Sequence, residues 1–296
     1  MKHDSVIAKV ALVAAFSSVS VLARAEEPAG GLMKDKSASA GKEDVATSGF
    51  ETQAKPDAEA KDVTELKLAA GGLAAGGNSR SISATGSGKF RVRREANQLT
   101  LGAAANYGRS APSPAESTKT TVENYQGKTR YDRFLAGGFA VFGAMSGLRD
   151  RFQGLDLRLN LDPGLAYYFV DEAKQQLWGE LGYDLQYDVR RQANLDEAAA
   201  KGDPQDKTEV RHSGRLFVGY SNSLSATATL DTGLEYLQAV TETKNWRVNW
   251  AVSLTSAIAG NFSIAAAFNL KYDDNPLPGV KNTDYLSSLS LVYTLL

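Results

Sequence analysis

The chain has 296 residues, a formal net charge of −1, no cysteine and a mean hydropathy of −0.29. The weak net charge argues against a nucleic-acid partner, and the lack of cysteine excludes a fold held by disulfides. The hydropathy is too low for a bundle of spanning helices, but it suits a barrel in which only every second strand residue faces lipid.

The first 25 residues have the pattern of a secretory signal peptide. Lys2 and Lys9 precede an apolar run over 10–22, and residues 23–25 form an A-x-A cleavage site. Cleavage removes three basic residues and one acidic residue, which changes the formal charge from −1 to −3. We therefore expect an exported protein.

Residues 26–63 are rich in Ala, Lys, Glu, Asp, Ser and Gly and show no periodicity. Such a segment buries too little apolar surface to offset the entropy of ordering it. We expect a disordered periplasmic leader. A plug folded into the barrel interior, or a segment that binds a partner, is the alternative.

From residue 64 to residue 296, apolar and polar residues alternate in twelve segments, as in FSIAAAFNLKY at 262–272. This pattern predicts an all-β fold, a closed antiparallel up-and-down transmembrane β-barrel of about twelve strands. An even number returns both termini to the periplasm. The segments are 65–73, 81–93, 98–107, 122–134, 139–148, 155–169, 176–189, 210–220, 226–239, 246–258, 262–272 and 285–295.

The connections between these segments alternate between short and long. The short ones predict periplasmic turns, and the longer, polar ones predict loops outside the cell. We expect this alternation through all eleven connections. The short turns are 95–97, 135–138, 171–175, 222–225 and 259–261, and the longer loops include 110–120, 191–209 and 273–284.

Strand parity places one charged set of side chains in the barrel interior. Basic residues gather on the second and fourth strands and acidic ones on the seventh and ninth, which predicts a transverse field across the lumen. The expected lumen-lining residues are Lys89, Arg91, Lys128, Arg130, Asp132, Arg158, Glu180, Asp184, Asp188, Arg215, Asp231, Glu235, Arg247 and Lys271.

Aromatic residues fall near the strand ends, where the girdles of a membrane barrel lie. A soluble barrel would instead place them in its core. The expected girdle residues are Trp246, Tyr272 and Tyr285 at the outer interface and Tyr167, Phe169, Tyr220, Phe262 and Tyr293 at the inner one.

Three groups of residues raise the question of catalysis or metal binding. His212 and Ser213 are adjacent on one strand and point to opposite faces, so they cannot form a base and nucleophile pair. Glu180, Asp184 and Asp188 share a face, but neighbours in this set are ~13 Å apart, which favours ion-paired wall residues over an acid and base pair. Asp273, Asp274, Asn275 and Asp284 share one predicted loop, but their spacing matches no calcium loop, and Asp and Asn beside Pro276 and Pro278 favour a rigid turn. We expect no catalytic residue, metal site or cofactor.

The stretch YDDNPLPG at 272–279, followed by Lys281, Asp284 and SLSLVYTLL at 288–296, resembles the closing signature of the YdiY-like family of salt-induced outer-membrane proteins, a domain of unknown function (DUF481). The stretch LKLAAGGLAAGGNSRSISATGSGKF at 66–90 is similar to the start of that family's domain. The resemblance implies a barrel in the outer membrane of a Gram-negative bacterium, without a settled activity. One departure is the terminal Leu296, where barrels commonly end in Phe or Trp for the insertion machinery.

The sequence therefore predicts a small pore or an envelope protein linked to salt or osmotic stress, with outer-membrane lipid and the insertion machinery as partners. The alternatives are an outer-membrane hydrolase and an interaction protein that uses its loops or its leader. The oligomeric state stays open, and the lumen residues are expected to set any ion preference.

Overall fold

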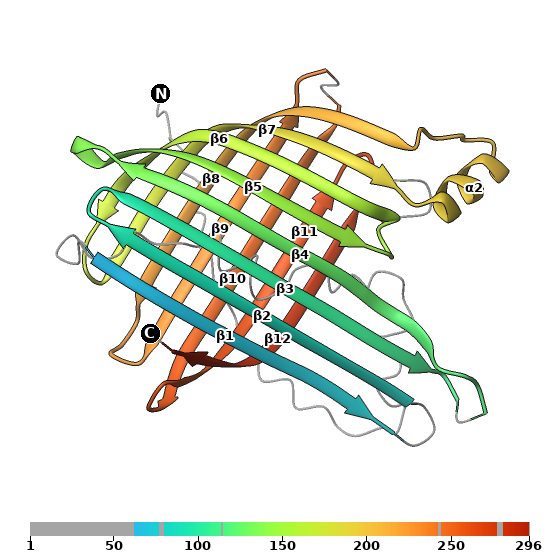
Figure 1. Cartoon of the computed structure of the whole chain (residues 1–296), viewed down its shortest axis with the longest axis horizontal. Coiled ribbons are helices and arrows are strands. Elements are labelled where there is room, and N and C mark those ends of the chain that lie inside the picture. Colours follow the sequence, from blue (N-terminus) through green and yellow to red (C-terminus); the bar gives the residue numbers. More distant parts are fainter. Residues whose placement is uncertain (1–61, 77–79, 114, 242–243, 277–280, 296) are drawn as a thin grey trace, which may run out of the picture.

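The computed structural model describes residues 62–76, 80–113, 115–241, 244–276 and 281–295. In this part of the chain twelve antiparallel strands form one closed barrel, in which sequence neighbours pair and β12 pairs with β1 (Figure 1). The predicted fold class is confirmed. The strands are β1 (Asp62–Ala75), β2 (Arg80–Arg94), β3 (Asn97–Ala111), β4 (Lys119–Phe134), β5 (Phe139–Asp150), β6 (Leu155–Asp171), β7 (Gln175–Arg190), β8 (Thr208–Ser223), β9 (Ala228–Ala239), β10 (Trp246–Ala259), β11 (Phe262–Asp273) and β12 (Thr283–Thr294).

The expected signal peptide and nearly all of the expected leader lie outside the described residues. The last two leader residues, Asp62 and Val63, belong instead to the barrel wall. They pair with Arg94 and Arg93 of β2, and Arg94 Nη1 also donates to the Val63 carbonyl oxygen at 3.2 Å. The wall therefore begins at residue 62, two residues earlier than the pattern predicts.

The strands contain 12 to 17 residues, more than the ~9–11 that cross a bilayer. The short turns, such as Gly260-Asn261, lie at one end of the barrel, which we call the turn end. The other end, with the connections 112–118 and 191–207, is called the loop end.

The β5–β6 connection departs from the predicted alternation of short turns and long loops. The β5–β6 connection at the loop end is the four-residue turn 151–154, no longer than the turn 135–138 at the opposite end. Asp150 closes it, because its Oδ1 accepts from the backbone N–H groups of Phe152 and Gln153. Gly154 supplies a φ of +71°, which glycine adopts at little cost.

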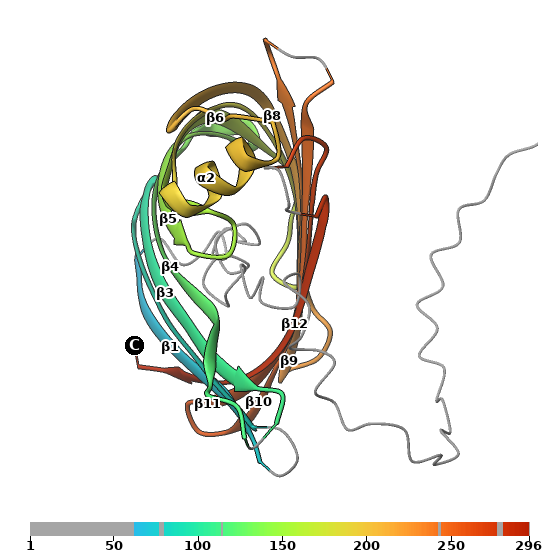
Figure 2. The ribbon, with the colours of Figure 1, turned by 90° about the vertical axis from the view of Figure 1, so that its right-hand side faces the viewer.

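A helix, α2 (Gln192–Ala200), occupies the connection between β7 and β8, where the sequence predicted only a loop (Figure 1). Figure 2 shows this helix at the loop end of the barrel. Its sequence QANLDEAAA is rich in strong helix formers. Pairs four residues apart add to this, with Gln192 donating to Asp196 and Lys201 to Glu197. A short 3-10 turn, η2 (Ala136–Gly138), links β4 to β5.

The barrel wall is apolar outside and polar inside. Large side chains on the outer face remain exposed, as at Leu161 (50%) and Leu181 (62%), whereas the interleaved Asp162 and Glu180 are buried. This is the reverse of a soluble protein, in which large apolar side chains are mostly buried. No helix in the described residues is long and apolar enough to span a membrane.

Candidate functional site in the barrel interior

An aromatic cluster fills part of the interior near the turn end. It consists of Phe142, Tyr168, Trp178 and Phe217, packed against the half-buried Phe134. Tyr168 stacks on Trp178 with ring centroids 6.1 Å apart, and Trp178 lies 6.1 Å from Phe217. The cluster therefore narrows the interior along the wall formed by β4 to β8.

An ion-pair network lies directly against this cluster. Arg130 on β4 contacts Asp132 on the same strand and Glu180 on β7, both at 2.8 Å. Arg215 on β8 contacts the same Glu180 at 2.7 Å and Glu235 on β9 at 2.5 Å. Because β4 and β7 are not neighbours in the barrel, the Arg130–Glu180 contact crosses the interior.

The aromatic rings also stabilise the two arginines of this network. The Arg130 guanidinium lies 4.1 Å from the ring centroid of Phe142, and that of Arg215 lies 5.3 Å from the centroid of Phe217. Such cation–π contacts offset part of the cost of burying a charge. Trp178 Nε1 adds a hydrogen bond of 3.3 Å to Glu180.

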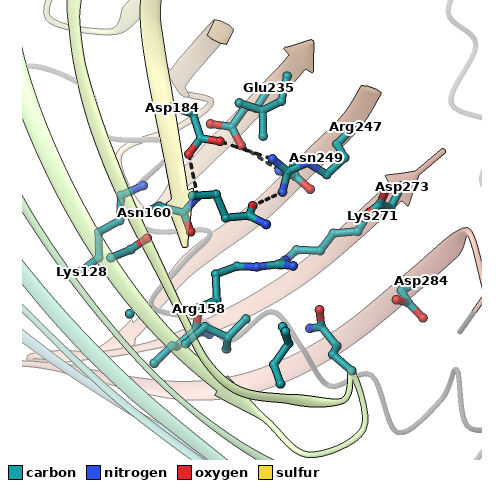
Figure 3. Close-up of a pocket in the computed structure, with 18 of the residues that line it drawn as sticks. Lys128, Arg158, Asn160, Asp184, Glu235, Arg247, Asn249, Lys271, Asp273 and Asp284 are labelled. Atoms are coloured by element: carbon teal, nitrogen blue, oxygen red, sulfur yellow. Dashed lines mark hydrogen bonds and ion pairs between the residues drawn. The ribbon is translucent and has the colours of Figure 1, made fainter. Parts of the chain in front are cut away.

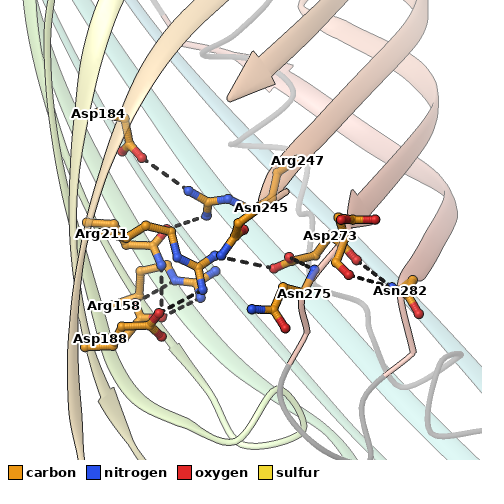
Figure 4. A network of polar contacts seen from close by, with 12 residues as sticks. Arg158, Asp184, Asp188, Arg211, Asn245, Arg247, Asp273, Asn275 and Asn282 are labelled. Carbon is orange, nitrogen blue, oxygen red and sulfur yellow. Dashed lines mark hydrogen bonds and ion pairs between the residues drawn. The ribbon is translucent and has the colours of Figure 1, made fainter. Parts of the chain in front are cut away.

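A second network occupies the loop end (Figure 4). Arg158 on β6 donates to both carboxylate oxygens of Asp188 on β7, at 2.8 and 2.6 Å. Arg247 on β10 reaches across β8 and β9 to Asp184 on β7 at 3.3 Å, and it also hydrogen-bonds Gln186. The loop end is thus bridged by side chains as well.

A cavity of about 180 Å³ lies against the second network and reaches Glu235 of the first (Figure 3). Its wall combines cations, carboxylates and amides with small residues such as Gly102 and Ser146. The charged lining residues are Lys128, Arg158, Arg247, Lys271, Lys281, Asp162, Asp184, Glu235, Asp273 and Asp284.

The other residues predicted to line the lumen are placed as follows. Arg91 on β2 pairs with Glu65 on β1 at 2.8 Å. Asp231 on β9 accepts from the Ser221 hydroxyl at 2.6 Å. Lys89 is half-buried on β2. Lys128 and Lys271 line the cavity, as described above.

The transverse field predicted across the lumen is weakened because its acidic residues pair directly with basic ones. The acidic residues of β7 each have an arginine within 3.3 Å: Glu180 with Arg130, Asp184 with Arg247 and Asp188 with Arg158. Opposite charges this close cancel most of each other's field at a distance. The sequence predicted a net field across the lumen because strand parity does not reveal that these opposite charges pair with each other across the interior.

The predicted girdle residues lie near the two ends of the outer wall. Near the turn end, Tyr167 contacts Phe169 with centroids 5.1 Å apart, and Phe262 contacts Tyr293 at 4.8 Å. Tyr220 at this end accepts a hydrogen bond from Asn222.

Near the loop end, Trp246 stacks on Tyr272 with centroids 4.7 Å apart. Tyr285, near the start of β12, is 60% exposed.

The groups considered for catalysis are separated or already occupied. His212 is on the outer face and hydrogen-bonds Tyr183, whereas Ser213 is 1% exposed and faces inward. Asp273 Oδ1 accepts from the Asn275 backbone N–H at 3.0 Å, as expected for a turn. Among the described residues, no three His, Cys, Asp or Glu side chains group so as to hold a metal ion.

Sequence reasoning missed the aromatic cluster and Arg211. Parity would have placed Tyr168, Trp178 and Phe217 inside, because each stands between outward-facing residues, but only charged residues were assigned there. Arg211 lies on the same inward face as Arg215. The alternation of residues therefore contained the information that the aromatic cluster and Arg211 face inward.

These features define a closed antiparallel barrel with an apolar exterior and a charged, partly bridged interior. The chain belongs to the family described as protein of unknown function, DUF481, whose model matches residues 68–295. The DUF481 resemblance is thereby confirmed, whereas the YdiY-like name stays a prediction.

Comparison with solved structures finds similar barrels. The NanC porin has 13% identity and a TM-score of 0.46, with 78% of this chain and 100% of that chain covered. The KdgM porin has 10% identity and a TM-score of 0.40, covering 79% and 100%. An outer-membrane channel from Pseudomonas putida F1 has 10% identity and a TM-score of 0.40, covering 81% and 100%. Comparison with curated proteins found no match.

Proposed function

We propose that this chain is a barrel of the bacterial outer membrane that forms a narrow pore for small polar solutes. The apolar outer wall supports insertion, because lipid-facing strand residues must be apolar while alternate residues face the lumen. The aromatic residues near both strand ends would lie at the membrane interfaces. The signal-peptide pattern of residues 1–25 agrees with export.

The turn end would face the periplasm and the loop end the outside, as usual for such barrels. Outer-membrane lipid and the insertion machinery are the partners that this proposal requires. That the chain is not an enzyme stays a prediction, which the separation of His212 and Ser213 supports.

The observation that carries the pore proposal is the polar cavity in the interior. It is lined by ionic and amide groups from strands on both sides of the barrel (Figure 3). The contacts Arg130–Glu180 and Arg247–Asp184 each join strands that are not neighbours and so place charged side chains in the interior, which is why we infer a narrow pore rather than a general diffusion channel.

The test is conduction by the mature chain in planar bilayers, recorded as conductance and reversal potential in a KCl gradient. The diagnostic variant combines Lys128→Gln with Lys271→Gln, since both lysines line the cavity. We expect the reversal potential to shift toward greater cation preference, because two positive charges leave the path.

The matched control combines Lys174→Gln with Lys201→Gln, which removes the same charge from exposed positions outside the cavity. Its reversal potential should equal that of the wild type. An equal shift in both variants would mean that the cavity is not the ion path. A folded barrel that never conducts would contradict the pore proposal and favour an envelope role, including one under salt or osmotic stress.

A further inference from the structure

We infer that the loop end of the interior holds a binding site for small oxyanions, built from Arg158, Arg211 and Arg247. We call these three residues the guanidinium cluster. The inference rests on the proposed function, because it names the class of solute that the pore would bind. It concerns binding alone, so it can be tested without conduction.

The guanidinium cluster brings three positive charges together from three strands. Arg158 lies on β6, Arg211 on β8 and Arg247 on β10, and Figure 4 shows them gathered around the same part of the interior. Arg247 is repelled by both of the others. Asp188 interacts electrostatically with all three.

Carboxylates neutralise this cluster, but their oxygens are already engaged by donors. Asp188 accepts from Arg158 through both oxygens, and from Gln186 at 2.9 Å. Asp184 accepts from Asn160 at 2.6 Å and from Arg247 at 3.3 Å. Each of these carboxylates is therefore already held by donors of the same network.

Arg211 carries unused hydrogen-bonding capacity. It is 8% exposed, and its Nη2 donates to Glu209 at 3.0 Å. Its Nε and Nη1 are buried and have no hydrogen-bond partner among the described residues. The Asp273 oxygen that Nη1 approaches is 4.0 Å away, too far for a hydrogen bond.

A buried guanidinium with unused N–H groups indicates a missing acceptor. Buried donors in folded proteins nearly always have a partner, and leaving one without a partner is costly. Arg158 and Arg247 line the cavity together with Asp273, and Arg211 Nη1 lies 4.0 Å from the Asp273 carboxylate, so Arg211 lies behind that part of the lining. A solute in the cavity would contact Arg158 and Arg247 directly and would reach Arg211 beside Asp273. Guanidinium groups match the planar or tetrahedral oxygens of carboxylate, sulfate and phosphate groups.

The experiment is calorimetric titration of the folded, full mature barrel in detergent, with sodium sulfate and sodium acetate as separate probes at constant ionic strength. The two probes separate a tetrahedral from a carboxylate oxyanion. The diagnostic variant is Arg211→Gln. We expect it to bind the preferred probe about tenfold more weakly, as for the loss of one charge-assisted hydrogen bond.

The matched control is Arg151→Gln, which removes the same charge at the same end of the barrel but from an exposed pair with Glu123. It should bind like the wild type. If Arg211→Gln does not reach the folded, heat-modifiable form, Arg211→Lys is measured in its place. It keeps the positive charge and removes the planar set of donors. It should also bind more weakly.

Equal binding by the wild type and a folded Arg211 variant, or no binding of either probe by the wild type, would overturn the inference. Such a result would leave the pore proposal intact if the barrel still conducts. Conversely, a barrel that binds a probe through Arg211 but does not conduct would refute the pore and support the site.

Discussion

The indole ring of Trp178 on β7 occupies the space above Gly219 on β8. A Cβ atom at residue 219 would lie 2.2 Å from Cζ2 of this ring and 2.4 Å from Cε2, closer than any real contact. Trp178 is 1% exposed and sits between Tyr168 and Phe217. The small residue on one strand therefore allows the large one on its neighbour to lie flat against the wall.

We predict that Gly219→Ala destabilises the folded barrel by about 1–3 kcal/mol, the usual cost of overpacking a filled core. Trp178 would have to move away from the wall, which would disturb the whole aromatic cluster. The measurement is urea unfolding followed by Trp emission. Gly214→Ala on the same strand is the control, because a Cβ there meets nothing within 4 Å. Equal stability of the two variants would contradict this account of the cluster.

Glu180 is the central acceptor between two buried arginines, so its charge should matter more than its size. Glu180→Gln keeps the shape but leaves Arg130 and Arg215 with one carboxylate partner each, Asp132 and Glu235. We expect a loss of about 3–5 kcal/mol in the free energy of unfolding, as when one partner of a buried pair is removed.

Glu197→Gln is the control for Glu180→Gln. Its partner is the exposed Lys201, and exposed pairs contribute about 0–1 kcal/mol. Both variants are compared by urea unfolding at neutral pH. A loss below about 1 kcal/mol for Glu180→Gln would mean that the interior is open enough for water to replace the lost charge.

Helix α2 is fixed to the β5–β6 turn through Gly154. The Arg191 backbone N–H donates to the Gly154 carbonyl at 2.8 Å, and a Cβ at residue 154 would lie 2.8 Å from Asn194 Cγ. We predict that Gly154→Ala leaves the barrel folded but detaches the helix, so that proteases cut within 192–207 faster.

The control for Gly154→Ala is Gly202→Ala, since Gly202 also has a positive φ, +82°, but a Cβ there meets nothing within 4 Å. Both changes strain the backbone, and only the first displaces Asn194. Equal rates of cleavage in the two variants would show that backbone strain, rather than the contact with Asn194, determines how firmly α2 is held.

The wall of the barrel is predictable from sequence because alternation directly reports which face of a strand is apolar. FSIAAAFNLKY places β11 within a residue of its observed ends, and the other strands were all found. The turn 151–154 was not, because a tight turn depends on Asp150 hydrogen bonds and one glycine conformation, which alternation does not encode.

The interior is predictable only as a set of inward residues and not as a set of contacts. Parity places Arg130 and Glu180 inside but cannot show that they meet across two intervening strands. Which strands face each other depends on the cross-section of the closed barrel. The same limitation hid the convergence of Arg158, Arg211 and Arg247, whose strands are not neighbours in the ring.

The three tryptophans provide a direct test of which face meets lipid. Trp250 is 40% exposed on the outer wall, and Trp246 lies four residues away on the same strand, ~13 Å nearer the loop end. Trp178 is buried inside the barrel. In liposomes of brominated lipid, we expect deep bromines to quench Trp250, shallow bromines to quench Trp246, and neither to quench Trp178.

Replacing one tryptophan at a time shows which residue gives each quenched or unquenched part of the emission. Trp250→Phe should abolish quenching by deep bromines, and Trp178→Phe should remove the emission that no bromine quenches, because only the lipid-facing rings remain. Each variant is first shown to fold by its heat-modifiable mobility. If Trp178 were quenched by deep bromines while Trp250 was not, the polar face of the wall would be the one in contact with lipid, and the proposed membrane insertion would be wrong.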